Sequence, residues 1–129
     1  KNINKNQCQF HKGCWEMGLK AHKLDIGNYA AMDNYFLAAC YNIVKDGENA
    51  LKMISPMQHH NGNFWFEIHS GVASHFSNKF ELAKNHFENV KKSIEGNKLS
   101  KIYDIFKKYN NERLSYPVYE EVLLKYDFE

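Results

Sequence analysis

Seven histidines and three cysteines are the side chains in this sequence that could bind a metal or transfer a proton. The densest group is the segment CQFHKGC, which holds Cys8, His11 and Cys14 at intervals of three residues. A helix would spread them over about a third of its circumference, and Cys40 could add a fourth ligand for tetrahedral zinc. The spacing is not a common zinc pattern, so we expect Cys14 and Cys40 to be small buried residues. We predict no metal site, and metal or ligand binding through Cys and His stays the alternative function.

The other residues that could do chemistry do not form a catalytic pattern. No HExxH pair, paired carboxylates or glycine-rich phosphate loop occurs, and the segment HSG lacks a nameable third partner. His75 and His86 could meet across a turn, but we expect the histidines to lie at the surface or its boundary. The sequence therefore predicts a protein that is not an enzyme and needs no cofactor.

Composition limits the class of protein and of partner. The chain has 129 residues, of which 43% are hydrophobic, and this suits a single domain over residues 1–129. No run of about 18 apolar residues occurs, so we expect no membrane partner. Only one arginine is present, and base reading depends strongly on arginine, so we expect no nucleic-acid partner.

The net charge of +2 is unevenly distributed. Residues 79–108 carry eight lysines against four acids, whereas residues 112–129 carry five acids against two basic residues. We interpret the lysine-rich face as a solvated helix surface, and docking of an acidic partner or a phosphate backbone is the alternative. The odd number of cysteines predicts reduced thiols and a cytoplasmic location. Because residue 1 is a lysine, we expect a processed or trimmed form of the chain.

Apolar residues recur at intervals of three or four along most of the chain, and this spacing predicts an all-α fold. About six antiparallel helices are expected, over residues 9–24, 28–45, 63–76, 80–94, 99–109 and from 117 onward. Residues 48–62 are expected to form one or two helical turns and then a loop that begins at Pro56.

The segment SNKFELAKNHFENVK predicts the start and inner face of the fourth helix. Asn78 and Glu81 have the spacing of a capping box. The residues expected to face inward are Leu82, Ala83, Phe87 and Val90.

Two parts of the chain, residues 14–40 and 65–92, repeat one plan of helix, short turn and second helix that opens with an aromatic residue. The second copy has small Gly71 in its first helix, then Phe80, Ala83, Phe87 and Val90 in its second. This pattern resembles the tetratricopeptide repeat family. Two features depart from it: the copies lie 51 residues apart rather than about 34, and neither has the closing proline.

The resemblance implies helical hairpins, over about 9–45 and 63–95, that stack as in a right-handed superhelix, with a C-terminal pair over about 98–127. A compact helical bundle is the alternative arrangement. The resemblance further implies a non-catalytic module that binds a protein or peptide on the face formed by the first helices of the hairpins. The residues expected on that face are Met17, Ala21, Trp65, Ile68, His69 and His75. An adaptor or chaperone-like domain and a dedicated inhibitor, such as a bacterial toxin immunity protein, are the two versions of this function.

Overall fold

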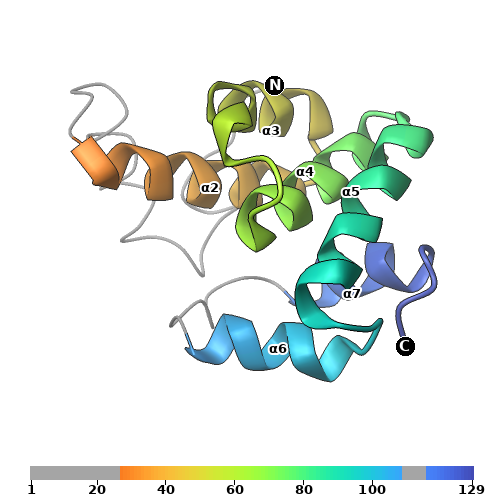
Figure 1. Ribbon diagram of the computed structural model, residues 1–129. Coiled ribbons are helices and arrows are strands. Elements are labelled where there is room, and N and C mark those ends of the chain that lie inside the picture. Colours follow the sequence, from red (N-terminus) through yellow and green to blue (C-terminus); the bar gives the residue numbers. More distant parts are fainter. Residues whose placement is uncertain (1–26, 109–115) are drawn as a thin grey trace.

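The computed structural model describes residues 27–108 and 116–129. Every regular element in these two ranges is a helix, which confirms the all-α fold class (Figure 1). Along the chain they are α2 (Gly27–Ile43), α3 (Gly47–Ile54), the 3-10 helix η2 (Ser55–His60), α4 (Phe64–Phe76), α5 (Phe80–Ile94), α6 (Leu99–Lys108) and α7 (Tyr116–Leu124).

A tight turn between α2 and α3 holds α3 directly against the end of α4. Lys45 adopts a left-handed conformation with φ of 62°, and Asp46 then caps α3 by accepting a hydrogen bond from the backbone N–H of Asn49 at 3.3 Å. A Cβ atom on Gly47 would lie 2.4 Å from the carbonyl oxygen of Ala73. Only glycine permits this close approach of the two helices.

Helices α4 and α5 form an antiparallel hairpin with a close contact at its centre. The side chain of Asn63 caps α4 by accepting a hydrogen bond from the backbone N–H of Trp65 at 2.9 Å. Gly71 is the small residue predicted for the first helix of this hairpin, and a Cβ there would lie 2.6 Å from the ring of Phe87. The missing side chain therefore lets the aromatic ring of α5 pack against the backbone of α4.

The turn of this hairpin corrects the predicted capping box. Asn78 has a left-handed φ of 61°, and the backbone N–H of Lys79 donates to the carbonyl of Ser74 at 2.8 Å. Lys79 holds the N-cap position of α5 and makes no side-chain capping bond. Asparagine tolerates the left-handed conformation, and here it ends α4 instead of capping α5.

The inner face of α5 is also narrower than predicted. Ala83, Phe87 and Val90 are fully buried, as expected, whereas Leu82 is 43% exposed. Successive side chains of a helix point about 100° apart around its axis. Because Ala83 points into the core, Leu82 points toward the surface.

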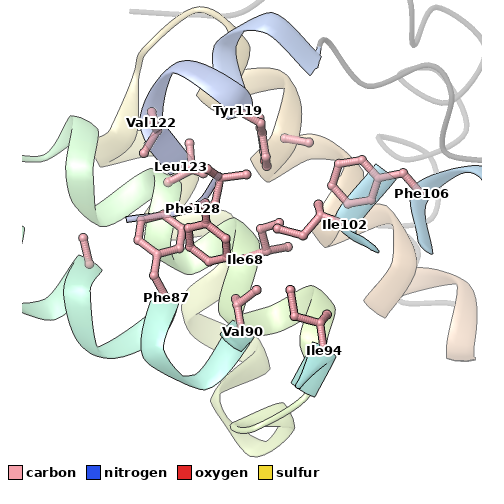
Figure 2. Packing of buried hydrophobic residues seen from close by; sticks show 13 residues of the cluster. Ile68, Phe87, Val90, Ile94, Ile102, Phe106, Tyr119, Val122, Leu123 and Phe128 are labelled. Carbon is pink, nitrogen blue, oxygen red and sulfur yellow. The ribbon is translucent and has the colours of Figure 1, made fainter. Parts of the chain in front are cut away.

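The main hydrophobic core joins α4 and α5 to the two C-terminal helices. Figure 2 shows Ile68 of α4 near the centre of this cluster, with residues of α7 on one side and residues of α5 on the other. Its buried residues other than alanine are Ile68, Val72, Phe87, Val90, Ile94, Ile102, Phe106, Tyr119, Val122, Leu123 and Phe128.

A second, smaller core lies between α2, α3, η2 and α4. Its buried residues are Ala38, Ala50, Ile54, Met57, Phe66 and Ala73. Residues 55–60, where the sequence predicted a loop, form 3-10 turns with a kink at the buried Met57. Together, α3 and η2 account for the long spacing between the two repeat-like segments.

The C-terminal residues are bonded to the turn between α5 and α6. The backbone N–H of Leu99 donates to the carbonyl of Glu129, and the backbone N–H of Glu129 donates to the carbonyl of Asn97, both at 2.9 Å. Phe128, just before them, is 3% exposed and packs in the main core. This segment therefore closes the core at the end of the molecule away from α3 (Figure 1).

Candidate partner-binding groove

A two-part groove lies between α3 and η2 on one side and the α4–α5 hairpin on the other. The part we call the outer lobe has a volume of about 890 Å³. It is lined by Lys45, Asp46, Gly47, Glu48, Leu51, Lys52, Ser55, Pro56, Phe76, Ser77, Asn78 and Lys79. The close contact at Gly47 fixes the wall that α3 contributes to this lobe.

The second part, which we call the inner lobe, is smaller and more apolar at its base. It has a volume of about 420 Å³, a size typical of ligand and side-chain pockets. It is lined by Leu51, Ile54, Ser55, Gln58, Asn61, Phe66, Ser70, Lys79, Leu82 and His86. Buried Ile54 and Phe66 form its base, and exposed Leu82 stands at its edge.

The two lobes join at three shared residues, Leu51, Ser55 and Lys79. Neither the ammonium group of Lys79 nor that of Lys52 has an acidic partner within residues 27–108 and 116–129. In the outer lobe, Asp46 is occupied in capping α3. Glu48 also lines the outer lobe, whereas the inner lobe has no acidic lining residue, so no acid of the inner lobe balances the charge of Lys79.

One buried hydroxyl group beneath the inner lobe has no hydrogen-bond partner. Ser70 is 2% exposed, and its Oγ atom makes no hydrogen bond in the structure. Most buried polar atoms in proteins are hydrogen-bonded, and leaving one unpaired costs about 1–3 kcal/mol. This atom is therefore a ready hydrogen-bond donor or acceptor for a group that enters the lobe.

Behind the inner lobe, a buried carboxylate fixes the position of His86. The side chain of Glu67 is fully buried and accepts hydrogen bonds from Nδ1 of His86 at 2.7 Å, the backbone N–H of Gly62 at 2.6 Å and Nδ2 of Asn89 at 3.2 Å. These bonds satisfy a charge whose burial would otherwise be strongly unfavourable. They also connect α4 to α5 and to the loop before α4.

These groups do not assemble a reaction centre in this conformation. A Ser–His–carboxylate triad needs a hydrogen bond between the serine and the histidine, and Ser70 Oγ has none. Ser70 also lies within α4, where backbone N–H groups are used in helical bonds and cannot stabilise an oxyanion. Ser70, His86 and Glu67 therefore do not form such a triad.

The structure places two of the predicted partner-binding residues in the interior, which corrects that prediction. Ile68 is fully buried in the main core, and His69 is 3% exposed. Nδ1 of His69 and the hydroxyl of Tyr119 are 2.7 Å apart, and Asn42 donates to that hydroxyl at 3.0 Å. Burial raises the pKa of Tyr119. These residues join α2, α4 and α7, so the predicted face of α4 is covered by other helices.

Trp65 and His75 also pack against neighbouring helices. The Trp65 ring stacks on Phe106 of α6, with centroids 5.3 Å apart. Nδ1 of His75 lies 3.0 Å from the hydroxyl of Tyr126, and the ring of Phe80 lies 5.5 Å away. His75 and His86 therefore have different partners and do not form a pair.

The remaining predicted positions lie outside the described residues. These are Met17 and Ala21 of the predicted binding face, and Cys8, His11 and Cys14 of the alternative metal site. Cys40 is described and is buried at 1% exposure, as predicted. Within residues 27–108 and 116–129, no cluster of three His, Cys, Asp or Glu side chains could hold a metal ion.

A tyrosine–histidine contact lies on the other face of α4. The hydroxyl of Tyr35 is hydrogen-bonded to Nδ1 of His60, which joins α2 to η2. Burial, with a contribution from the charge of Glu67, raises the pKa of Tyr35 to about 12. Burial, together with His59, lowers the pKa of His60. This contact helps to hold η2, which forms one wall of the inner lobe.

Comparisons with known proteins give no family for this chain. Neither protein-family models nor curated proteins nor solved structures match it. In the described part of the chain, no helix combines the length and the apolar character needed to cross a membrane. The resemblance to tetratricopeptide repeats therefore depends on the residues quoted above alone.

The groove was not predicted because its walls, α3–η2 and the α4–α5 hairpin, follow each other in the chain but are brought together only by tertiary packing. The sequence predicts Lys79 on a solvated face and Leu82 in the core. It places Leu51 in the connection over residues 48–62, for which it predicts one or two helical turns and then a loop. A charged residue inside the apolar run FWFEIHSG was the one local signal, because such a residue needs partners when buried. That signal indicates Glu67 and its neighbourhood.

Proposed function

We propose that this protein is a non-catalytic module that binds a partner protein through the groove between α3–η2 and the α4–α5 hairpin. The observation that supports this most is the exposed apolar edge at Leu82 beside a lobe of about 420 Å³. The base of this lobe is formed by apolar Ile54 and Phe66, and concave pockets of this size that are lined mainly by apolar residues are typical of binding sites.

The proposal moves the binding surface from the one that the tetratricopeptide resemblance implies. In that family, first helices line the concave face, but here Ile68 and His69 of α4 are buried. The opposite side of the same hairpin, with Leu82 and His86, faces the groove. The resemblance still supports the class of function, since helical hairpins of this kind commonly serve as binding modules.

Photo-crosslinking in the organism that makes the protein tests this proposal. The photoreactive residue p-benzoylphenylalanine replaces Leu82 in the groove or, as a matched control, exposed Lys107 on α6. We expect a defined protein to be crosslinked from position 82 and not from position 107. The same set of proteins from both positions, or none from position 82, would contradict the proposal.

The number of crosslinked partners separates the two versions of the function. One partner in a 1:1 complex, encoded beside this protein, favours a dedicated inhibitor such as a toxin immunity protein. Several partners that share a short segment favour an adaptor or chaperone-like domain.

A further inference from the structure

We infer that the partner segment bound by the groove inserts a large apolar side chain into the inner lobe and places an adjacent carboxylate at Lys79. This inference rests on the proposed function and specifies the chemistry of its partner. Its occupant is a protein segment in which an aromatic or large aliphatic residue is flanked by acidic residues.

The shape and lining of the inner lobe support the apolar part. Its base is formed by Ile54 and Phe66, which are 2% and 5% exposed, and its edge by Leu51 and Leu82. Covering these side chains removes apolar surface from water, and this stabilises a complex in proportion to the area buried. A polar or small side chain would leave the apolar surface of the inner lobe exposed to water.

The charge around the lobe supports the acidic part. Lys79 lies where the lobes meet, and the inner lobe has no acidic lining residue to oppose it. Lys52 lines the outer lobe a short way along the same groove. Asp46 and Glu48 also line the outer lobe, so the charge that favours an acidic segment over a basic one is that of Lys79 on the side of the inner lobe.

The buried hydroxyl of Ser70 is the second, independent observation. It is 2% exposed, lines the inner lobe and has no hydrogen-bond partner. The neighbouring His86 is held by Glu67, so it cannot rotate to Ser70 without losing that bond. A backbone or carboxylate group of an inserted segment would supply the missing partner and add orientation to the apolar contact.

Three matched synthetic peptides test this chemistry directly. The first has a phenylalanine between two glutamates, the second replaces both glutamates by glutamine, and the third replaces the phenylalanine by alanine. Binding is measured by amide chemical shifts of the full chain during NMR titration. We expect the first peptide to bind at least about fivefold more tightly than either of the others, with shifts at Lys79, Leu82 and His86.

Two pairs of variants assign the effect to named groups. Lys79→Gln should remove the preference for glutamate, whereas Lys84→Gln, which makes the same change on exposed α5 surface, should keep it. Ser70→Ala removes a buried unpaired hydroxyl, so it should fold with unchanged or higher thermal stability and yet bind the first peptide more weakly. Its melting temperature distinguishes lost binding from lost folding.

Several results would overturn the inference. Equal binding of the glutamate and glutamine peptides would remove the acidic requirement, and tighter binding of free 4-phenylbutyrate than of any peptide would indicate a small carboxylate instead. A dimer that Leu82→Asp dissociates would indicate a second copy of the chain. If crosslinking from position 82 succeeds while the peptides fail, the proposed function stands and only its chemistry is wrong.

Discussion

The contact between α3 and the end of α4 gives the sharpest prediction, for the variant Gly47→Ala. The added Cβ would lie 2.4 Å from the carbonyl oxygen of Ala73 and 2.7 Å from the backbone nitrogen of Ser77. Ordinary contacts begin at about 3.4 Å, so α3 must move away by about 1 Å. The obstructing atoms belong to the backbone, and no side-chain rotation can relieve them.

Two opposing effects set the size of the change. Alanine favours a helix over glycine by about 1 kcal/mol, which alone would stabilise the protein. Overpacking of a filled site costs about 1–3 kcal/mol, and an obstruction by backbone atoms belongs near the upper end. We therefore expect a net loss of about 2 kcal/mol in the free energy of unfolding. For a chain of this length the melting temperature should fall by about 8 °C.

Urea unfolding followed by circular dichroism at 222 nm measures this loss. Glu48→Ala, an exposed change at the next position of α3, serves as the control and should alter stability by less than about 0.5 kcal/mol. A Gly47→Ala protein as stable as the wild type, or more stable, would refute the close packing of α3 on α4 and with it the shape of the outer lobe.

Three further predictions follow from buried contacts. Glu67→Ala should lower the unfolding free energy by about 3 kcal/mol in urea titrations, because three hydrogen-bond donors lose their acceptor. Phe128→Ala should lower it by about 3–5 kcal/mol, because a side chain 3% exposed leaves a cavity in the main core. Burial, and then Lys125, lower the pKa of His75 below its usual 6.5. Below pH 6.5 the unfolded chain therefore binds more protons than the folded protein, so the free energy of unfolding should fall as the pH drops. This fall should be smaller in the variant His75→Gln.

A specific result would contradict each of these three predictions. A Glu67→Ala protein within about 0.5 kcal/mol of the wild type would mean that the carboxylate is hydrated and not buried. Phe128→Ala with unchanged stability would mean that the C-terminal segment is undocked. If an NMR titration of His75 had a midpoint above pH 6.5, His75 would contribute to the pH dependence of stability with the opposite sign, which would contradict the third prediction.

The helices that the sequence predicted well are those whose local signals agree with their packing. Asn63 precedes an apolar run and caps α4 as asparagine does in many proteins. Ala83, Phe87 and Val90 recur at helical spacing, and all three are buried. Fold class and the α4–α5 hairpin could therefore be predicted from the sequence.

Helix ends were predicted less well, because residues other than glycine also adopt left-handed conformations there. Lys45 has a φ of 62° two residues before Gly47, and Glu95 has a φ of 55° directly before Gly96. Gly47 instead starts α3, where its missing side chain allows close packing. A tertiary contact, which no local pattern records, decides the use of that glycine.

The candidate site was the part least visible in the sequence. His69 and Ile68 looked like surface residues because the helical period alone does not say how many neighbours cover a helix. Residues of α2, α5, α6 and α7 pack with Ile68 of α4 in the main core, and the groove lies where α3 and η2 face the α4–α5 hairpin. Leu82 was assigned to the core for the same reason, since an apolar residue beside an inward stripe can border a groove as well.

Amide hydrogen exchange of the complex with its crosslinked partner tests the central claim most directly. If the groove is the binding surface, residues 47–55 and 79–86 should exchange more slowly in the complex than in the protein alone, while α6 should be unchanged. Protection confined to α6 and α7, with none along the groove, would contradict the account.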